Sequence, residues 1–507
     1  MSVETMAIPK KCRALVGGQR KSFGEKLEVR SPYSRQVVGI TCLAGPEDVG
    51  EVIRSSQEGF ESMRRTPSYK RYEMLQGIAQ RIEQRREELA HVMAQESGKP
   101  IKDSRAEVER AVMTFTIASE EAKRIPGDSI PLDLNQLSEG RFGVIRRFPI
   151  GPILGITPFN FPLNLVGHKV APALASGSSI IIKPSTKTPL TALLLGEIAM
   201  DAGVPAGAFN VVPCSNETTR FFITDDRIKM ITFTGSTDVG WGLKAKAGKK
   251  RVTLELGGNA AAVIDEGANL DYAVKRLTVG AYYYAGQSCI SVQRMYIHRP
   301  LYAEFLDNYL RQVKALKVGD PLDESTDVGP VIDQAAADRI EEWIEEALDR
   351  GATILTGGGR DGWVFEPTVL ENVPSDVRVS CGEAFAPVVT VAPYDHFEDA
   401  IRAVNDSEYG LQAGIFSNNF GHILRAYNEL EVGQVIVNDA PTYRIDHMPY
   451  GGVKDSGFGR EGIKYAMEEM AEMRLLTVNA PQAIPAINPS RTATSRRRPR
   501  GISGIRR

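Results

Sequence analysis

A cysteine and a glutamate in the middle of the chain are the residue types that covalent chemistry on a carbonyl carbon requires. Cys289 lies in the segment Ala285–Ser291 (AGQSCIS), 34 residues after Glu255. A thiolate in a loop can add to a carbonyl carbon and keep the acyl group as a thioester. A carboxylate beside it can deprotonate the water that releases the acid. The pair predicts this chemistry, provided that the fold brings the two side chains together.

Both residues also have an ordinary structural interpretation. Most cysteines, in a chain that has 5 of them, are buried small hydrophobic residues. A carboxylate on a strand is most often solvated or ion-paired. However, Gly286, Gln287 and Ser288 interrupt an apolar run that is typical of a helix end, and the strand 253–256 stops at a pair of glycines. We therefore expect the cysteine and the glutamate beside turns, where a ligand can reach them.

The elements around Glu255 alternate between strand and helix. Apolar runs and their spacing predict strands at 153–156, 178–182, 209–212, 230–233 and 251–256, with helices at 163–174, 190–200 and 239–247. A second alternating block starts near residue 260 and carries Cys289, and residues 48–124 are strongly helical. Such alternation predicts an α/β fold with two doubly wound parallel sheets, which bind ligands at the carboxyl ends of their strands.

Composition excludes several classes of protein. The chain has 507 residues, 42% of them hydrophobic and 24% charged, which suits a globular protein of two or three domains. It has no run of eighteen apolar residues and no secretory signal pattern, so we expect no membrane span. Five scattered cysteines favour reduced thiols in the cytoplasm. Six histidines without a ligand cluster predict no metal site.

The net charge of −2 is unevenly distributed. Residues 491–507 contain seven arginines and no acidic residue, so the preceding chain carries −9. An acidic body argues against nucleic-acid binding. The simplest interpretation of the Arg-rich tail is a disordered segment, although an acidic or phosphate-bearing partner is an alternative.

A series of short motifs along the chain identifies a family resemblance. In order they are Thr157–Pro162 (TPFNFP), Lys183–Ser185 (KPS), Phe233–Thr237 (FTGST), Glu255–Gly258 (ELGG), Gly286–Cys289 (GQSC), Glu383–Pro387 (EAFAP), Pro449–Lys454 (PYGGVK) and Ser456–Gly457. Together, from about residue 20 to about residue 480, they resemble the aldehyde dehydrogenase superfamily. The resemblance is to the branch with lactaldehyde, phosphonoacetaldehyde, semialdehyde and non-phosphorylating glyceraldehyde-3-phosphate dehydrogenases. It implies an NAD(P)-dependent enzyme that oxidises an aldehyde to a carboxylic acid.

The resemblance also implies a domain organisation. Residues 1–124 and 149–256 are expected to form the cofactor-binding domain, and residues 257–469 the catalytic domain. Residues 125–148 and 470–490 fit neither, and they are expected to form a β-flap that joins subunits into a homodimer or homotetramer.

Three residues are expected to carry the catalysis. Cys289 is the nucleophile, and Glu255 activates the water. Asn160 lies between two prolines and offers an amide donor, which with the Cys289 backbone N–H can stabilise an oxyanion. An asparagine that caps the next helix is the structural alternative for Asn160.

The cofactor prediction starts from the absence of a G-x-G-x-x-G turn. Instead, Gly235 and Ser236 join a strand to a helix whose N-terminus can hold a diphosphate, although a plain helix cap is the alternative. The resemblance assigns Lys183 to the adenine-side ribose and Glu383 to the nicotinamide-side ribose. The full set of expected cofactor-binding residues is Thr157, Pro158, Phe159, Lys183, Ser185, Thr186, Gly235, Ser236, Leu256, Glu383 and Phe385.

Thr186 bears on the choice between the two cofactors. Many NAD-preferring members have a glutamate three residues after the lysine, and this chain has Thr186 there. A carboxylate at this point would accept both ribose hydroxyls and repel a 2′-phosphate. Its absence favours NADP or the use of both cofactors.

The expected substrate is a small polar or anionic aldehyde. The residues expected to contact it are Phe161, His168, Ser288, Ile290 and Arg444, with further walls from Asn164, Leu165, the segment 113–116 and the loop 441–447. Arg444 is a candidate for binding an anionic tail, but a salt bridge with Asp446 is an equal alternative. Arg105 and Arg110 are further candidates, with a helix-surface role as the more ordinary interpretation.

Three other functions are open on these residues. Acylating members of the superfamily pass the acyl group to coenzyme A and generally lack the glutamate found here at 255, so Glu255 favours hydrolysis. A non-catalytic binding protein is disfavoured by the joint presence of Cys289, Glu255, Asn160 and Lys183. A cysteine hydrolase needs a histidine partner, and the one near the motif is His298.

Overall fold

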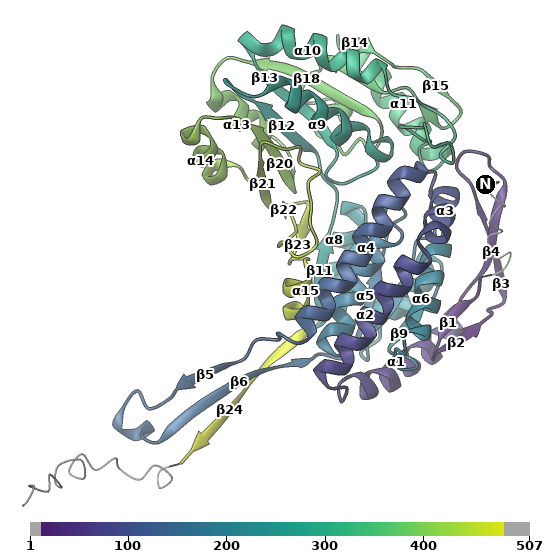
Figure 1. The fold of residues 1–507 in the computed structure, drawn as a ribbon, viewed down its shortest axis with the longest axis vertical. Helices are drawn as coiled ribbons and strands as arrows, with labels where there is room; N and C mark the ends of the chain where they lie inside the picture. The colour runs from purple at the N-terminus through teal and green to yellow at the C-terminus, as the bar shows by residue number, and fades with distance from the viewer. Residues whose placement is uncertain (1–11, 481–507) are drawn as a thin grey trace, which may run out of the picture. The chain divides into compact units, whose positions relative to one another are not determined.

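The structure is a computed structural model and describes residues 12–480 (Figure 1). The described part of the chain divides into two compact units. One lies within Met1–Ile125 and Phe148–Glu472, the other within Pro126–Arg147 and Met473–Arg507. The predicted disordered tail, residues 491–507, lies outside the described residues.

The first sheet of the larger unit has eight strands in the order β2-β1-β9-β8-β7-β10-β11-β23. Their bounds are β1 Ala14–Val16, β2 Gln19–Lys21, β7 Pro152–Ile156, β8 Ser179–Lys183, β9 Phe209–Val211, β10 Met230–Thr234, β11 Arg251–Glu255 and β23 Gly457–Phe458. The five strands from β9 to β11 are parallel. The chain runs outward from β7 to β9 on one side and from β10 to β11 on the other, so the order reverses between β7 and β10, as in a doubly wound sheet.

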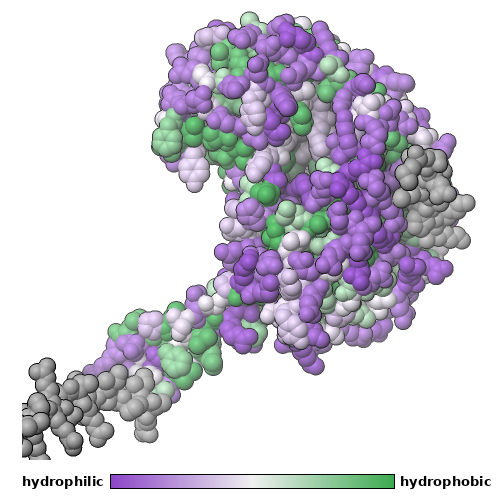
Figure 2. Space-filling view, viewed as in Figure 1, coloured by the Kyte–Doolittle hydropathy of each residue, from purple (hydrophilic) through white to green (hydrophobic). Residues whose placement is uncertain are grey.

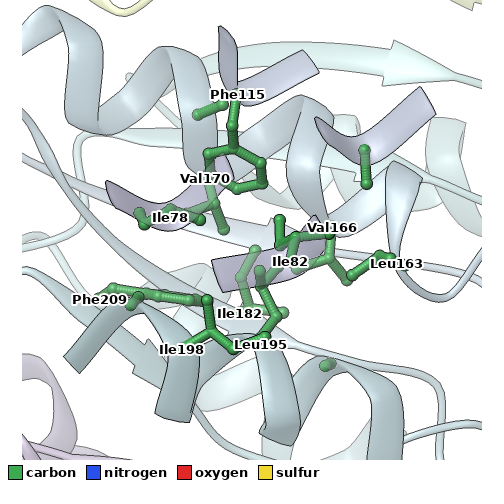
Figure 3. Close-up of a cluster of buried hydrophobic side chains, with 14 of the residues drawn as sticks. Ile78, Ile82, Phe115, Leu163, Val166, Val170, Ile182, Leu195, Ile198 and Phe209 are labelled. Carbon is green, nitrogen blue, oxygen red and sulfur yellow. The ribbon is translucent and has the colours of Figure 1, made fainter. Parts of the chain in front are cut away.

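Helices cover both faces of this sheet, which explains why its strands read as continuous apolar runs. Their bounds are α1 Val49–Met63, α2 Ser68–Gln84, α3 Arg86–Ser97, α4 Ile101–Ala122, α5 Asn164–Ser176, α6 Leu190–Asp201, α7 Asn216–Thr224 and α8 Thr237–Lys246. In β8, Ile182 packs in the cluster with α2, α4, α5 and α6 (Figure 3), and Ile180 belongs to the same cluster. Ile181 joins the other cluster, with α1, α7 and α8. Alternate residues of one strand thus enter two separate cores.

The second sheet has seven strands in the order β14-β17-β18-β13-β12-β20-β21. Its strands are β12 Ala260–Ile264, β13 Val292–His298, β14 Thr353–Thr356, β17 Thr368–Glu371, β18 Val388–Tyr394, β20 Gln412–Phe416 and β21 Gln434–Val437. All pairs are parallel except β14 with β17. Its helices are α9 Leu270–Tyr282, α10 Arg299–Lys314, α11 Gln334–Asp349, α13 Phe397–Asn405 and α14 Phe420–Glu429. The predicted α/β fold with parallel sheets is confirmed, whereas the division into cofactor-binding and catalytic domains stays a prediction.

The remaining elements are short. They are β3 Glu25–Arg30 with β4 Val37–Leu43, β15 Arg360–Asp361 with β16 Val364–Phe365, β19 Tyr409–Gly410 with β22 Val453–Lys454, and the helices α12 Arg378–Cys381 and α15 Ile463–Glu469. No helix within residues 12–480 is long and apolar enough to cross a membrane.

The smaller unit is built around a three-stranded sheet in the order β24-β6-β5. Its strands are Ala471–Asn479, Arg141–Pro149 and Asp128–Pro131. Figure 2 shows apolar side chains gathered on this element. Its exposed large apolar residues are Leu134, Leu137, Phe142, Met473, Leu475 and Leu476. A β element from the segments 125–148 and 470–490 was expected, and its role in assembly stays a prediction.

Candidate active site

A cavity of about 810 Å³ in the larger unit is lined by the segments that follow β7 and β10 and by the first residue after β11. The cysteine loop before β13 and a loop before β22 also line it. Among the predicted site residues, those in its lining are Pro158, Phe159, Asn160, Phe161, His168, Gly235, Ser236, Leu256, Ser288, Cys289, Ile290, Glu383, Phe385 and Arg444. The fold thus brings most of the predicted residues to one cavity at strand ends.

The loop that carries Cys289 has an unusual backbone. Tyr284 and Ala285, in the 3₁₀ turn η3 (Tyr283–Gly286), have φ angles of 48° and 53°. Non-glycine residues pay roughly 1–2 kcal/mol each for this left-handed conformation. The buried Tyr284 ring secures it, because its hydroxyl donates to the Ser97 carbonyl at 2.8 Å and its face lies 4.6 Å from the Lys99 ammonium. Helix α3 and the residues after it therefore hold the cysteine loop in place.

Cys289 has one polar partner for its sulfur. The Sγ atom lies 3.3 Å from the hydroxyl oxygen of Tyr450. Burial raises the pKa of the Cys289 thiol to about 12, although the Tyr450 hydrogen bond opposes the rise. In residues 12–480 the Cys289 backbone N–H has no hydrogen-bond acceptor, so it is free to donate to a ligand. A thiol with so high a pKa is protonated at neutral pH.

Glu255 ends β11 and is buried, with 3% of its surface exposed. Both of its carboxylate oxygens lack a hydrogen-bond partner among the described residues. Burial raises the pKa of Glu255 well above its ordinary value, and the negative charge of Glu461 adds to the rise. The expected alternatives, a solvated or ion-paired carboxylate, are therefore both wrong. Glu255 is not part of the cavity lining.

Asn160 belongs to the cavity wall and does not cap the next helix. Its amide nitrogen donates to the Gln287 carbonyl at 3.0 Å, which leaves one N–H of the amide and the buried Oδ1 without a partner. The first amides of α5 are instead capped by Glu107, whose Oε1 accepts from the backbone N–H groups of Leu163 and Asn164 at 3.0 Å. Asn160 is thus tied to the cysteine loop and retains a donor for a ligand.

The N-terminus of α8 opens onto the cavity. Ser236 occupies the N-cap position of this helix, but its side chain makes no capping hydrogen bond. Thr234, Gly235, Thr237 and Asp238 line the cavity beside it. An uncapped helix N-terminus presents backbone N–H groups and a partial positive charge, which suit a diphosphate. The alternative of a plain helix cap is thus right about the position of Ser236 but not about a capping hydrogen bond.

Glu383 and the turn after β11 lie against each other. The Glu383 carboxylate accepts the Gly258 backbone N–H at 3.0 Å, and burial raises the pKa of Glu383 to about 7. The adjoining Phe385 ring packs edge-on against Phe159, with ring centres 5.8 Å apart. At Gly258 a Cβ atom would lie 2.0 Å from the Cys289 carbonyl oxygen. Only glycine allows the turn after Glu255 to approach the cysteine loop this closely.

Four predicted cofactor residues lie outside the cavity lining: Thr157, Lys183, Ser185 and Thr186. Lys183 is buried at the end of β8, and its ammonium donates to Asn216 Oδ1 at 3.3 Å. Burial lowers the pKa of Lys183. Ser185 and Thr186 are half-buried just beyond it.

One expectation about the substrate wall is wrong, and a second is confirmed in part. Of the segment 113–116, Met113 is exposed and Phe115 is in the hydrophobic core (Figure 3), so α4 contributes Ala106 and Arg110 to the cavity instead. Of the loop 441–447, only Thr442, Tyr443 and Arg444 line the cavity.

The salt bridge between Arg444 and Asp446, which was the alternative to an anion-binding role for Arg444, does not form in residues 12–480. Arg444 bonds Glu461 at 3.2 Å and His168 at 3.1 Å, and its guanidinium lies 3.5 Å from the centre of the Tyr450 ring. Asp446 instead bonds His168 at 2.6 Å and Arg110 at 3.1 Å. Arg110 is therefore more than the helix-surface charge expected of it, whereas Arg105 pairs with Glu87 and Glu324 at the surface.

These contacts form a charge network of six residues: Arg110, His168, Lys169, Arg444, Asp446 and Glu461. Lys169, fully buried, donates to Glu461 at 2.8 Å and to Thr234 at 2.7 Å. Although burial opposes it, Lys169 and Arg444 lower the pKa of Glu461 to about 2. Sequence reasoning missed Lys169, Glu461 and Tyr450. Only the motif Pro449–Lys454 gave a signal, and it was used for the resemblance alone.

No group of three or more His, Cys, Asp or Glu side chains within residues 12–480 is arranged to hold a metal ion.

The comparisons with known proteins agree with this geometry. The aldehyde dehydrogenase family pattern matches residues 19–476. The 3-sulfolactaldehyde dehydrogenase of Priestia aryabhattai is 44% identical over 465 residues, 92% of this chain and 97% of the relative. Aldehyde dehydrogenase 21 from Physcomitrella patens, solved in complex with the reaction product succinate, superposes with a TM-score of 0.92 at 42% identity, covering 94% of this chain and 100% of that one.

A third relative was solved with a nucleotide cofactor. The glyceraldehyde-3-phosphate dehydrogenase of Methanocaldococcus jannaschii, complexed with NADP, superposes with a TM-score of 0.86 at 40% identity. The match covers 90% of this chain and 99% of that one. Since the family pattern spans nearly the whole described chain, the prediction of an aldehyde-oxidising enzyme is confirmed, and the chain belongs to the aldehyde dehydrogenase family.

Proposed function

We propose that this enzyme oxidises a small aldehyde with an anionic group to the corresponding carboxylic acid, through a thioester on Cys289 that water hydrolyses. The observation that carries the proposal is the single cavity of about 810 Å³ that both Cys289 and the N-terminus of α8 line. A nucleophile and a diphosphate site in one cavity suit a reaction between an aldehyde and a dinucleotide.

NAD⁺ or NADP⁺ supplies the oxidising power, because its nicotinamide accepts a hydride. The uncapped N-terminus of α8 fits its diphosphate, and Glu383 fits the hydroxyls of one ribose. Thr186 stands where a carboxylate would repel a 2′-phosphate, and one solved relative is complexed with NADP. These observations favour NADP or dual use.

In the first half of the reaction, the Cys289 thiol loses its proton and the sulfur adds to the aldehyde carbon. The carbonyl oxygen becomes an oxyanion, which the free N–H of the Asn160 amide and the Cys289 backbone N–H stabilise. Each such donor is worth roughly 2.7–4 kcal/mol in a water-poor site. Loss of hydride then leaves the acyl group on sulfur as a thioester.

In the second half, Glu255 takes a proton from the water that attacks the thioester. Burial raises its pKa, so Glu255 is a strong proton acceptor once it is ionised. Its oxygens have no hydrogen-bond partner in the part of the chain that the structure describes, so they are free to bind that water. Acylating enzymes do not need such a carboxylate, so Glu255 favours hydrolysis over transfer to coenzyme A.

The anionic group is supported by the names of the relatives. One acts on a sulfonated aldehyde, one was solved with the dicarboxylate succinate as its product, and one acts on a phosphorylated aldehyde. Within the cavity, Arg444 is buried and already pairs with Glu461, which argues against its predicted role. We assign the binding of the anionic group to Arg110. Its side chain is 33% exposed and lines the cavity, and one of its nitrogens bonds Asp446.

A substrate panel tests the reaction. We expect NADPH or NADH to form with 3-sulfolactaldehyde, succinate semialdehyde or glyceraldehyde 3-phosphate, together with free acid and without coenzyme A. Neutral lactaldehyde should be oxidised with a lower kcat/KM. Cys289→Ser should abolish turnover. Activity that survives this substitution, or that requires coenzyme A, contradicts the proposal.

Two arginines of α4 form a matched test of the anion site. Arg110→Met should raise KM for the anionic aldehyde by about 10-fold or more, the loss of one charge-assisted contact, with little change for neutral lactaldehyde. Arg105→Met removes a surface arginine of the same helix and should leave both values unchanged. Equal losses with charged and neutral aldehydes contradict the assignment of Arg110.

We also propose that the three-stranded sheet of the smaller unit joins subunits into a homodimer or homotetramer. Its exposed apolar residues are of the kind that monomeric proteins rarely gather on one element. Leu476→Glu should lower the molecular mass measured by sedimentation. An unchanged mass contradicts this interface.

A further inference from the structure

Tyr450 is a buried residue whose hydroxyl points at the nucleophile. Only 2% of its surface is exposed, and its hydroxyl oxygen lies 3.3 Å from Cys289 Sγ. Within residues 12–480 the hydroxyl has no other hydrogen-bond partner. Its ring packs with Ile290 and Leu411 in a small apolar cluster that Cys289 joins. A buried phenol needs a partner, and here the reactive sulfur is that partner.

The position of this ring is fixed from two directions. The backbone of Tyr450 exchanges two hydrogen bonds with Glu461, at 3.0 and 2.7 Å. The Arg444 guanidinium lies on the ring face, 3.5 Å from its centre, and is itself held by Glu461 at 3.2 Å and His168 at 3.1 Å. A desolvated cation is attracted by the negative face of an aromatic ring. It also withdraws electron density from the phenol, which makes the O–H a better donor.

From this arrangement we propose that Tyr450 is a catalytic residue whose hydroxyl donates a hydrogen bond to Cys289 Sγ as the thiol ionises, with Arg444 as its positioning residue. The inference rests on the proposed role of Cys289 as the nucleophile. The S–H proton leaves to solvent water, the negative charge stays on sulfur, and the O–H of Tyr450 remains intact and turns toward that charge. The sulfur then forms its bond to the aldehyde carbon while the carbonyl π electrons move to oxygen.

This assignment divides the charge of the first step between two donors. Tyr450 stabilises the sulfur before bond formation, and the Asn160 amide stabilises the oxygen after it. The electrostatics of the site agree, because burial, Glu383 and Glu255 all raise the pKa of Cys289, while Tyr450 and Arg444 lower it. Without the phenol, a buried thiolate would face two acidic side chains with only Arg444 to oppose them.

The test is Tyr450→Phe, which removes one oxygen atom and keeps the ring under Arg444. In the full-length enzyme at pH 8, iodoacetamide should alkylate Cys289 about 10-fold more slowly than in the wild type, since hydrogen bonds to charged groups contribute roughly 1.5–3 kcal/mol. The pH at which alkylation reaches half its maximal rate should rise. The pre-steady-state burst of reduced cofactor should slow to a similar extent.

Two controls separate this role from a structural one. Tyr309→Phe removes an equally buried hydroxyl in the core of the second sheet and should leave alkylation unchanged. Arg444→Lys keeps the charge beside Glu461 but not the planar stack, and its alkylation rate should fall between those of the wild type and Tyr450→Phe.

The outcomes distinguish this inference from the proposed function. Wild-type alkylation and burst rates in Tyr450→Phe overturn the inference even where Cys289→Ser is inactive. So does a lower melting temperature or cofactor affinity without slower alkylation, because the hydroxyl is then structural. Activity that persists in Cys289→Ser refutes the proposed function first and the inference with it.

Discussion

The charge network and the catalytic groups lie close together but differ in whether their buried polar groups have partners. In the network, each of the three cations pairs with Asp446 or Glu461. His168, whose pKa is lowered by burial, hydrogen-bonds Asp446. Among residues 12–480, Glu255 has no hydrogen-bond partner on either oxygen, and Asn160 leaves its Oδ1 without one. Both sets are largely buried.

The difference separates support from function. An unpaired buried polar group costs roughly 1–3 kcal/mol, and more when it is charged, so an unpaired buried carboxylate is costly to keep. Among residues 12–480 the network also has unpaired atoms, Arg110 Nε and Arg444 Nε, but each of these guanidinium groups has an ion-pair partner. A paired group maintains the shape of the site and its electrostatic field. An unpaired group is available to bind water, substrate or cofactor. The contrast predicts that substitutions in the network cost stability, while those among the unpaired groups cost turnover.

The largest effect is expected at the unpaired carboxylate. Glu255→Gln should lower steady-state kcat by about 10³-fold, within the range for loss of a general base. A burst of reduced cofactor close to one equivalent per active site should remain, because the first half of the reaction does not need the carboxylate. Stopped-flow absorbance measures both. A lost burst with normal steady-state turnover would contradict the role of Glu255.

The same substitution at the paired carboxylate should act on folding. Glu461→Gln leaves Lys169 and Arg444 buried with uncompensated charge, so the free energy of unfolding should fall by roughly 3–5 kcal/mol. Denaturant unfolding measures the change. Glu324→Gln, which breaks an exposed ion pair with Arg105, is the control and should cost less than about 1 kcal/mol. Equal losses of unfolding free energy in the two variants would contradict the stabilising role of the network.

A carboxylate introduced at position 186 should make the enzyme discriminate between NADP⁺ and NAD⁺. Thr186→Glu should weaken NADP⁺ binding by about 10- to 100-fold through charge repulsion and leave NAD⁺ binding equal or tighter. Dissociation constants from fluorescence titration give the ratio. Thr186→Ala, which adds no charge, should change neither. A wild-type preference for NAD⁺ would contradict the interpretation of Thr186.

The smallest effect concerns pH. Burial raises the pKa of Glu383 to about 7, so the side chain is protonated below that pH and is a carboxylate above it. Only the carboxylate accepts hydrogen bonds from two ribose hydroxyls, so cofactor affinity should rise several-fold as the pH increases through 7. Glu383→Gln should bind more weakly, with a flat profile between pH 6 and 8. A rise that persists in this variant would point to another group.

The fold and the site differ in how far the sequence predicts them. Short apolar runs predict the strands of the first sheet, because a strand covered on both faces is apolar along its whole length. The face that a helix turns toward the cavity is harder to predict from the sequence. Ala106 and Arg110 face the cavity, while Met113 points to solvent and Phe115 to the core, and that rotation depends on how α4 packs. The network was missed because it joins positions far apart in the chain, such as His168 and Asp446.

The strained turn before Cys289 has a consequence for the durability of the enzyme. Two adjacent residues, Tyr284 and Ala285, are kept in a conformation they would leave if the anchors at Ser97 and Lys99 loosened. On warming, the loop with the nucleophile should relax before the sheets come apart. Turnover would then fade while circular dichroism still records a native spectrum. Efforts to extend the working life of the catalyst should begin at that tyrosine anchor, which does not itself line the cavity.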